Sequence, residues 1–372
     1  MPSQGKRRGE SMNETKRKRS SIPWGLIFNV FIICLTIGLV VFFIFSKDGF
    51  IDLLSSGLKI NMLWLILALF MHLLNIAIDA TVIYLFVRRS TPTFKVREAI
   101  VVSMVGQFYC AVTPGASGGQ PMQVLTMTRM GVKASNATAA LIQKFLVWQF
   151  TLTGYSIAAM ALRFSMFVQS LDFAMWILTI IGFIGQVLTI VVLLLASFNQ
   201  KVTTKVIGGI YKLLAKIHLM KNVDEKIRKL EESLTNFHNC NKDLNKDKKL
   251  VVEVYVLTFV QLTVLFLIPY CIAKSFGNEG VQMFDMICAQ SFVSMVSGLV
   301  PMPGGSGAAE YCFSAFFGTV FNEQMIKSAI LIWRTITYYL TIIISLPFAG
   351  IRKKKALEAI EPETETAGTA AP

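Results

Sequence analysis

Long apolar segments, separated by polar or charged stretches, recur along the chain. A helix needs about 20 apolar residues to cross the hydrocarbon core of a bilayer. Six segments reach this length, so the pattern predicts six membrane-spanning helices, at residues 24–45, 62–87, 134–162, 173–197, 250–275 and 324–349.

Two further apolar regions, 98–130 and 281–319, are interrupted midway by clusters of proline and glycine. Such clusters break helices, because proline lacks an amide hydrogen and glycine favours turns. Each region is therefore either one kinked span or a hairpin of two half-helices that enters and leaves the membrane by the same face. The distribution of basic residues distinguishes these alternatives, because cytoplasmic loops are enriched in lysine and arginine.

With two hairpins and a cytoplasmic N-terminus, 29 of the 36 lysine and arginine residues fall on the cytoplasmic side. With only one hairpin, the basic cluster at 352–355 would lie on the opposite side from the basic N-terminus. With two full spans, the loop 201–249 and its twelve basic residues would face outward. We therefore predict an all-α, multi-pass protein of the cell membrane, with two re-entrant hairpins and both termini in the cytoplasm.

The two interruptions carry the same pattern, Pro-Gly-x-Ser-Gly, at 114–118 and 303–307. An odd number of crossings separates the two units, so they run in opposite directions, as in an inverted repeat whose binding site lies at the repeat interface. The predicted organisation has three parts: a basic cytoplasmic N-terminus (1–22), a membrane domain (23–350) and a disordered cytoplasmic tail (351–372). Within the membrane domain, a first repeat (about 62–162) and a second repeat (about 250–350) are joined through an amphipathic cytoplasmic loop (200–249).

The composition narrows the classes of function. Apolar residues make up 54% of the chain and charged residues 16%, whereas a soluble domain carries about a quarter charged residues, so a purely soluble protein is excluded. The net charge of +14 follows the membrane topology, and no motif for nucleic acid accompanies it. The six cysteines show no CxxC or Cys/His pairing, so neither a metal site, a cofactor nor a disulfide framework is predicted.

Each Pro-Gly turn is a candidate anion site, because glycine lets the backbone approach a ligand and the following half-helix presents free N–H groups. Ser117 and Ser306 are the expected caps; Gln120 fits a capping box with Ser117, whereas Glu310 lies one residue too far from Ser306. The alternative for either turn is a helix kink or a tight packing contact. The candidate substrate-binding residues are Pro114, Gly115, Ser117, Gly118, Gly119, Gln120, Lys144, Pro303, Gly304, Gly305, Ser306, Gly307, Glu310, Arg334 and Tyr338.

Two of these candidates, Lys144 and Arg334, lie deep in apolar helices, where an unpaired charge is costly. Asp79 is the only deep acidic residue in the helix before the first hairpin, and His72 and Asn75 share its helix face. Asp79 is either a structural counter-ion for one of the two cations or part of a substrate or proton path, with His72 as a second candidate for a proton relay.

The stretches TPGASGGQP, PMPGGSGAAE and WRTITYYLTIII resemble the signature stretches of the lysylphosphatidylglycerol synthase transmembrane region, also called the flippase-like domain family. The resemblance covers about residues 20–350 and implies a membrane part that moves an aminoacylated phospholipid, or another lipid-linked anionic head group, between leaflets. Bifunctional members add a soluble aminoacyltransferase domain, which is not expected here. This chain departs from the family at Gln120, where glutamate is common, and at Gln143 and Lys144, where a Glu-Arg pair is frequent.

The first functional hypothesis is therefore a lipid flippase or transporter. One alternative is a phosphatidylglycerol lysyltransferase, or its membrane subunit, which would synthesise lysylphosphatidylglycerol from lysyl-tRNA with a separate catalytic domain. Another alternative is a scaffold subunit that does not itself transport lipid. The expected partners are a phospholipid or other lipid-linked anionic substrate, bilayer lipids and a separate synthase or glycosyltransferase chain. A homo-oligomer is compatible with the sequence, no nucleic acid is expected as a partner, and no cofactor is expected.

Overall fold

The computed structural model describes residues 60–349, apart from 164–172, 200–222 and the single residues at 299, 301 and 319. Every regular element within these described residues is a helix, which confirms the prediction of an all-α protein. The first predicted span, at 24–45, both predicted terminal segments and the first half of the predicted cytoplasmic loop lie outside the described residues.

Four helices among the described residues are long and apolar enough to cross a membrane, and each coincides with a predicted span. The second repeat differs from the first because its last span is not a regular α-helix: α15 (Glu323–Arg334) continues as the π-helix η3 (Thr335–Tyr339) and then as α16 (Leu340–Ser345) and η4 (Leu346–Phe348). The other spans are α3 (Met62–Ser90), α6 (Ala134–Leu162), and α11 (Lys248–Phe266) with α12 (Ile268–Ser275).

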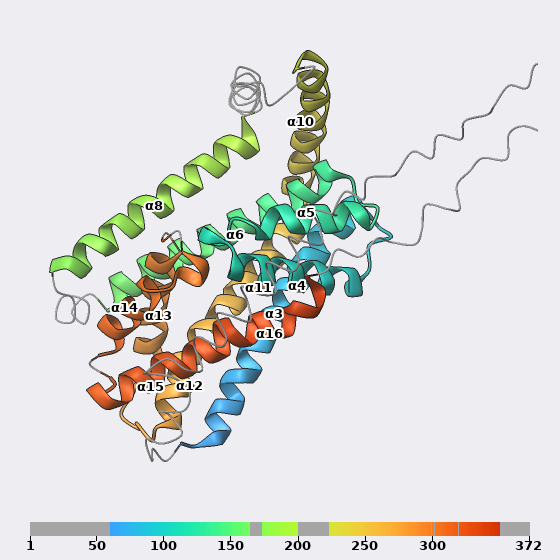
Figure 1. The fold of residues 1–372 in the computed structure, drawn as a ribbon. Coiled ribbons are helices and arrows are strands. Elements are labelled where there is room, and N and C mark those ends of the chain that lie inside the picture. Colours follow the sequence, from blue (N-terminus) through green and yellow to red (C-terminus); the bar gives the residue numbers. More distant parts are fainter. Residues whose placement is uncertain are drawn as a thin grey trace, which may run out of the picture.

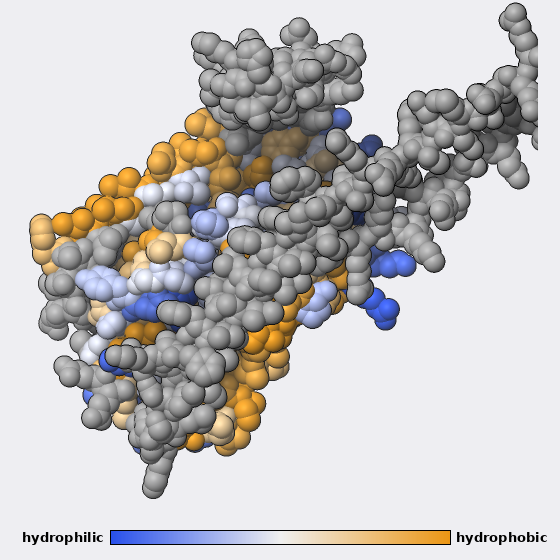
Figure 2. Space-filling view, viewed as in Figure 1, coloured by the Kyte–Doolittle hydropathy of each residue, from blue (hydrophilic) through white to orange (hydrophobic). Residues whose placement is uncertain are grey.

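The fifth predicted span within the described residues forms the helix α8 (Phe173–Phe198), which carries an apolar stretch at Thr179–Leu195. This helix lies at the edge of the bundle against α6 and α13, as Figure 1 shows. Its outward side chains are apolar, among them Ile180, Ile184 and Leu188, which are more than half exposed. Figure 2 shows hydrophobic surface along α8, whereas hydrophilic side chains gather at the end of the bundle near α5. An apolar girdle with a polar end is the surface expected for contact with lipid.

Both interrupted regions fold back on themselves. In the first, α4 (Val96–Val112) and α5 (Gly119–Arg129) flank the short 3₁₀ turn η1 (Pro114–Ala116), and Gln123 of α5 donates a hydrogen bond to the carbonyl of Val102 in α4 at 3.1 Å. In the second, α13 (Met283–Ser297) and α14 (Ala308–Phe317) flank η2 (Pro303–Gly305). Here the rings of Phe292 and Phe316 lie 5.7 Å apart between centroids.

The two segments predicted to be repeats are packed against each other. The helices that precede the hairpins, α3 and α11 with its continuation α12, lie side by side (Figure 1). The tips η1 and η2 are in direct contact, and α16 packs against α4. Two hydrogen bonds join the repeats near the tips: the Tyr338 hydroxyl donates to the Ala111 carbonyl at 3.0 Å, and the Tyr109 hydroxyl donates to the Ala349 carbonyl at 3.1 Å.

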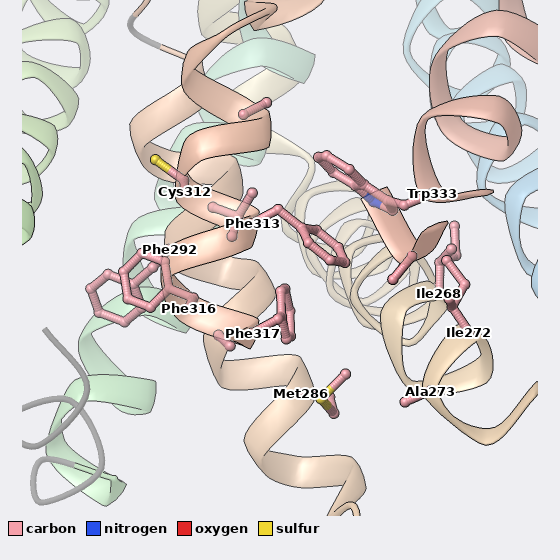
Figure 3. Close-up of a cluster of buried hydrophobic side chains, with 14 of the residues drawn as sticks. Ile268, Ile272, Ala273, Met286, Phe292, Cys312, Phe313, Phe316, Phe317 and Trp333 are labelled. Carbon is pink, nitrogen blue, oxygen red and sulfur yellow. The ribbon is translucent and has the colours of Figure 1, made fainter. Parts of the chain in front are cut away.

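Aromatic side chains hold the second hairpin in place. Figure 3 shows Phe313 and Phe317 of α14 facing Trp333 and the side chains of α12, with Phe316 turned toward Phe292. The rings of Phe313 and Trp333 lie 4.9 Å apart between centroids, and Phe313 and Phe317 are fully buried. Within a bilayer such van der Waals packing drives helix association, because lipid and side chain are equally apolar.

The described part of the loop between the repeats is the helix α10 (Val223–Lys246), which packs against α6. Phe237 and Leu244 are buried in this contact. Asn241 donates to the carbonyl of Ser197 at 2.8 Å and accepts a hydrogen bond from Gln143. The described second half of the loop is therefore helical and is docked on α6.

Candidate functional site

A cavity of about 680 Å³ lies where the two repeats meet. More than half of the residues that line it carry polar side chains, although the helices that form it are apolar. The first repeat contributes His72, Asn75, Asp79, Gly106, Gln107, Cys110, Gly115, Ala116, Ser117, Gln120, Gln123, Leu141, Lys144, Phe145 and Trp148, and the second contributes Gln261, Leu265, Gln290, Ser294, Trp333 and Thr337.

The tip of the first hairpin is exposed and forms one side of this cavity. Gly115 and Ala116 both have left-handed backbone angles, with φ of +59° and +55°. Glycine adopts this conformation freely, whereas alanine pays a strain of about 1–2 kcal/mol. The turn therefore stores strain at a position that faces the cavity.

The predicted cap by Ser117 is wrong. Ser117 has helical backbone angles (φ −66°, ψ −24°), so it cannot take the extended conformation of a capping residue, and α5 begins only at Gly119. Thr113 instead stabilises the turn, because its hydroxyl oxygen accepts a hydrogen bond from the Gly118 amide at 2.9 Å. The capping box of Ser117 with Gln120 is not formed, and both residues line the cavity instead.

The second turn is capped one residue later than the sequence suggested. Gly307, with φ of +86°, precedes α14, and its amide donates to the Glu310 carboxylate at 2.6 Å. Glu310 therefore occupies the third helical position after Gly307, whereas it forms no capping box with Ser306, as its spacing predicted. Ser306 does not cap the helix, since its hydroxyl donates back to the Pro303 carbonyl at 2.8 Å.

Arg334 binds both the backbone of the second turn and the first helical turn of α14. Its Nε lies 2.7 Å from Oε1 of Glu310, and its Nη1 donates to the Gly304 carbonyl at 2.9 Å. Its guanidinium also lies 5.0 Å from the ring centroid of Trp333 and 5.5 Å from that of Tyr338. We call this group, Gly304, Glu310, Arg334 and Tyr338, the turn clamp. The Arg334 side chain is only 7% exposed, so its charge is neutralised by Glu310 within the protein.

The other deep cation, Lys144, is paired with Asp79. Its Nζ lies 2.5 Å from Oδ1 of Asp79, whose Oδ2 accepts a hydrogen bond from the Ser103 hydroxyl at 2.6 Å. The carboxylate is buried, whereas the Lys144 side chain is 18% exposed and reaches the cavity. Of the two pairings left open by the sequence, the structure contains Asp79 with Lys144. The counter-ion of Arg334 is Glu310 of α14, which the sequence did not single out as a partner.

Six of the predicted site residues line the cavity: His72, Asp79, Gly115, Ser117, Gln120 and Lys144. Three others of the first repeat shape its hairpin from outside the wall: Pro114, Gly118 and Gly119. Those of the second repeat lie in or beside the turn clamp: Pro303, Gly304, Gly305, Ser306, Gly307, Glu310, Arg334 and Tyr338. Sequence reasoning missed a ring of amides, namely Gln107, Gln123, Gln261 and Gln290. Their signal was available, since an amide in an apolar helix needs a polar partner.

A smaller cavity of about 400 Å³ lies between α10 and the ends of α3 and α6. It is lined by Arg89, Lys133, Asp243 and Asp247, among others, and contains none of the predicted site residues. Arg89 and Asp247 form an ion pair there. Six of the residues that the sequence singled out therefore line the larger cavity, and none lines the smaller one.

Comparison with known proteins agrees with this architecture. Residues 26–345 match the family model described as the lysylphosphatidylglycerol synthase TM region. A UPF0104 membrane protein of Archaeoglobus fulgidus is 25% identical over 264 residues, which is 69% of this chain and 77% of that protein. An uncharacterized protein of Mycoplasma pneumoniae is 20% identical over 363 residues, or 90% of each chain.

Proposed function

Since the chain belongs to the lysylphosphatidylglycerol synthase TM region family, we propose that it is a lipid flippase or transporter. Its substrate would be an anionic or aminoacylated phospholipid, or another lipid-linked anionic head group. The head group crosses through the cavity between the two repeats, while the acyl chains stay in the bilayer against the apolar outer surface.

The observation that carries this proposal is a cavity lined by many polar side chains inside an apolar bundle. Polar groups at membrane depth are expensive, and they are retained where they line a path for a polar substrate. The cavity also lies at the interface of two repeats, where transporters with inverted repeats bind their substrates.

Within the cavity, we assign the phosphate to the side of the first turn. Lys144 presents a cation on the wall, and Ser117 and Gln120 offer further donors beside it. A phosphate at this place would compete with Asp79 for Lys144, so that binding and release would shift one ion pair. Arg334 does not contact the phosphate in this proposal; it holds the second turn in place against the first turn.

We further propose that the protein resides in the cell membrane with both termini in the cytoplasm. The distribution of basic residues supports this orientation, since 29 of 36 then lie on one side. Single cysteines at 117 and 306, introduced into a variant without other cysteines, test it in sealed vesicles. Ser117→Cys should react with an impermeant reagent from the cytoplasmic side and Ser306→Cys from the outer side. Labelling with the sides exchanged would contradict the orientation.

Transport is tested in liposomes that contain the purified full-length protein and a trace of head-group-intact phospholipid with a fluorescent acyl chain. An impermeant quencher reports the fraction of lipid that reaches the outer leaflet. We expect exchange well above that of protein-free liposomes, and at least a tenfold loss in Lys144→Ala. The matched control is Lys246→Ala, which removes an exposed lysine of α10 whose side chain is 67% accessible. Exchange at the protein-free rate by the wild type would refute the proposed function.

A further inference from the structure

The two predicted repeats place Gln120 and Glu310 in corresponding positions. Glu310 and Arg334 are 24 residues apart in the sequence, and so are Gln120 and Lys144. Glu310 and Gln120 each lie in the first turn of the helix that follows a hairpin tip, α14 and α5. Arg334 and Lys144 each lie about three turns into the next helix, α15 and α6. The first hairpin therefore has an amide where the second has a carboxylate.

This difference changes which charge is accessible in each repeat. In the second repeat, Glu310 neutralises Arg334, and the carboxylate is the more exposed partner, with side-chain exposures of 34% and 7%. In the first repeat, the carboxylate comes from Asp79 of α3 instead, and the order is reversed. The Lys144 side chain is 18% exposed and that of Asp79 only 8%. Both residues line the cavity, so the charge that the first repeat presents there is positive.

The Asp79 carboxylate has no oxygen left for a second cation. Its Oδ1 lies 2.5 Å from Lys144 Nζ, and its Oδ2 accepts the hydrogen bond of Ser103 at 2.6 Å. Asp79 is also the one carboxylate among the residues that line the cavity. The Lys144 ammonium has three N–H donors, and Asp79 is its only ionic partner within the described residues. Donors thus remain for an anion, whereas an entering cation would lose water and find no free carboxylate.

We infer that Gln120 determines the charge of the head group that the cavity accepts. An uncharged amide at this position leaves Lys144 available to a phosphate, so the cavity prefers an anionic lipid head group to a cationic, aminoacylated one. A glutamate here would neutralise Lys144, as Glu310 neutralises Arg334, and would reverse that preference. Gln120 is exposed and lines the cavity, so a head group can contact it. The inference rests on the proposed function, because it names the substrate class of the same site.

Binding to the purified full-length protein in detergent tests the inference without transport. The probes are two short-chain lipids with identical acyl chains: phosphatidylglycerol, which is anionic, and lysylphosphatidylglycerol, which is cationic overall. We expect the wild type to bind phosphatidylglycerol at least about tenfold more tightly by calorimetry, because only the lysyl lipid brings ammonium groups beside Lys144. Equal affinity for the two lipids, or tighter binding of the lysyl lipid, would overturn the inference.

Position 120 also allows a series of charges. In Gln120→Glu, phosphatidylglycerol should bind at least about tenfold more weakly and the lysyl lipid more tightly, so that the preference reverses. In Gln120→Lys, the preference for phosphatidylglycerol should exceed that of the wild type. Gln120→Met removes the amide without adding charge, so it should weaken the binding of both lipids by the same factor. A preference that is equal in all four proteins, or that is lost in Gln120→Met, would overturn the inference.

The matched control is Asn239→Asp, which adds the same charge at an exposed position of α10 that lines neither cavity. It should leave both affinities unchanged. If it shifts them as much as Gln120→Glu does, the net charge of the protein decides the preference and the inference is wrong. Gln120→Glu should melt no lower than the wild type, because the new carboxylate can pair with Lys144.

Leaflet exchange separates this inference from the proposed function. Preferential binding of phosphatidylglycerol without any exchange in liposomes would refute the proposed function and leave the inference standing. Exchange that favours the lysyl lipid in the wild type would overturn the inference and leave the proposed function standing.

Discussion

The two Pro-Gly-x-Ser-Gly turns share a sequence pattern and a left-handed backbone, but they differ in environment. In the first turn, residues 114–117 are exposed and Gly115, Ala116 and Ser117 face the cavity. In the second, Gly305 is buried and Arg334 and Tyr338 hold Gly304. The repeat thus specifies the path of the backbone, whereas the surrounding side chains leave one turn free to meet a ligand and fix the other.

The ion pairs Arg334–Glu310 and Lys144–Asp79 differ as the two turns do. Glu310 belongs to the hairpin itself, so its pair with Arg334 fastens the second turn to α15. Asp79 belongs to the helix before the first hairpin, so its pair with Lys144 spans the cavity wall and leaves the first turn untouched. One pair is structural in position, and the other is placed where a substrate can disturb it.

The largest effect on stability is expected from Glu310→Ala. It leaves the buried Arg334 without a counter-ion and removes the acceptor of the Gly307 amide, at a cost of about 3–5 kcal/mol in the free energy of unfolding. Thermal unfolding in detergent measures the loss. Glu279→Ala, an exposed carboxylate near α12, should change stability by less than about 0.5 kcal/mol. A stable Glu310→Ala protein would remove the distinction between the clamped and the open turn.

Gly304→Ala should have the next largest effect. A Cβ at this position would overlap the Tyr338 ring, and φ of +60° adds left-handed strain, so we expect a loss of about 2–4 kcal/mol. The corresponding change in the exposed turn, Gly115→Ala, adds left-handed strain at φ of +59° and should cost about 1 kcal/mol. Equal losses in the two variants, measured by thermal unfolding, would show that packing around the turns is equivalent.

Asp79→Asn should cost about 1–3 kcal/mol, less than Glu310→Ala, because the side chain of Lys144 reaches the cavity. If Asp79 is a counter-ion, the further change Lys144→Met should restore the melting temperature without restoring leaflet exchange. If Asp79 relays a proton, Asp79→Asn should melt like the wild type and lose only gradient-driven exchange. A variant with unchanged stability and unchanged exchange would contradict both roles.

The smallest effect is expected from Ala116→Gly. Glycine removes the left-handed strain at φ of +55° but adds freedom to the unfolded chain, so a gain of about 0.5 kcal/mol should remain. The reverse exchange in the second turn, Gly305→Ala, should destabilise, because the new Cβ would lie 2.9 Å from the Ser297 carbonyl oxygen. A higher melting temperature in Ala116→Gly and a lower one in Gly305→Ala would support the difference between the two turns. A lower melting temperature in both variants would contradict a strained and exposed first turn.

The sequence predicted the features that depend on local chemistry. Apolar segments of sufficient length located α3, α6, α8 and the later spans, and the proline and glycine clusters located both turns. The pairing of charges could not be predicted, because helical spacing places Asp79 on a face without saying which of two distant cations meets it. The cap of α14 was missed by one residue, because the left-handed Gly307 delays the start of the helix. The amides of the cavity come from several helices, and only their packing brings them together.

The π-helix at Thr335–Tyr339 lets the second repeat absorb a one-residue deletion that the regular helix α6 could not. A π-turn holds one residue more than an α-turn, so a one-residue deletion within it would restore α-helical geometry, and the helix on either side would keep the faces that it presents. Thr341 would then still face His72, and the span after Arg334 would still pack against α4. In the regular helix α6 the same deletion would rotate every later residue by about 100° and shift it by about 1.5 Å along the axis.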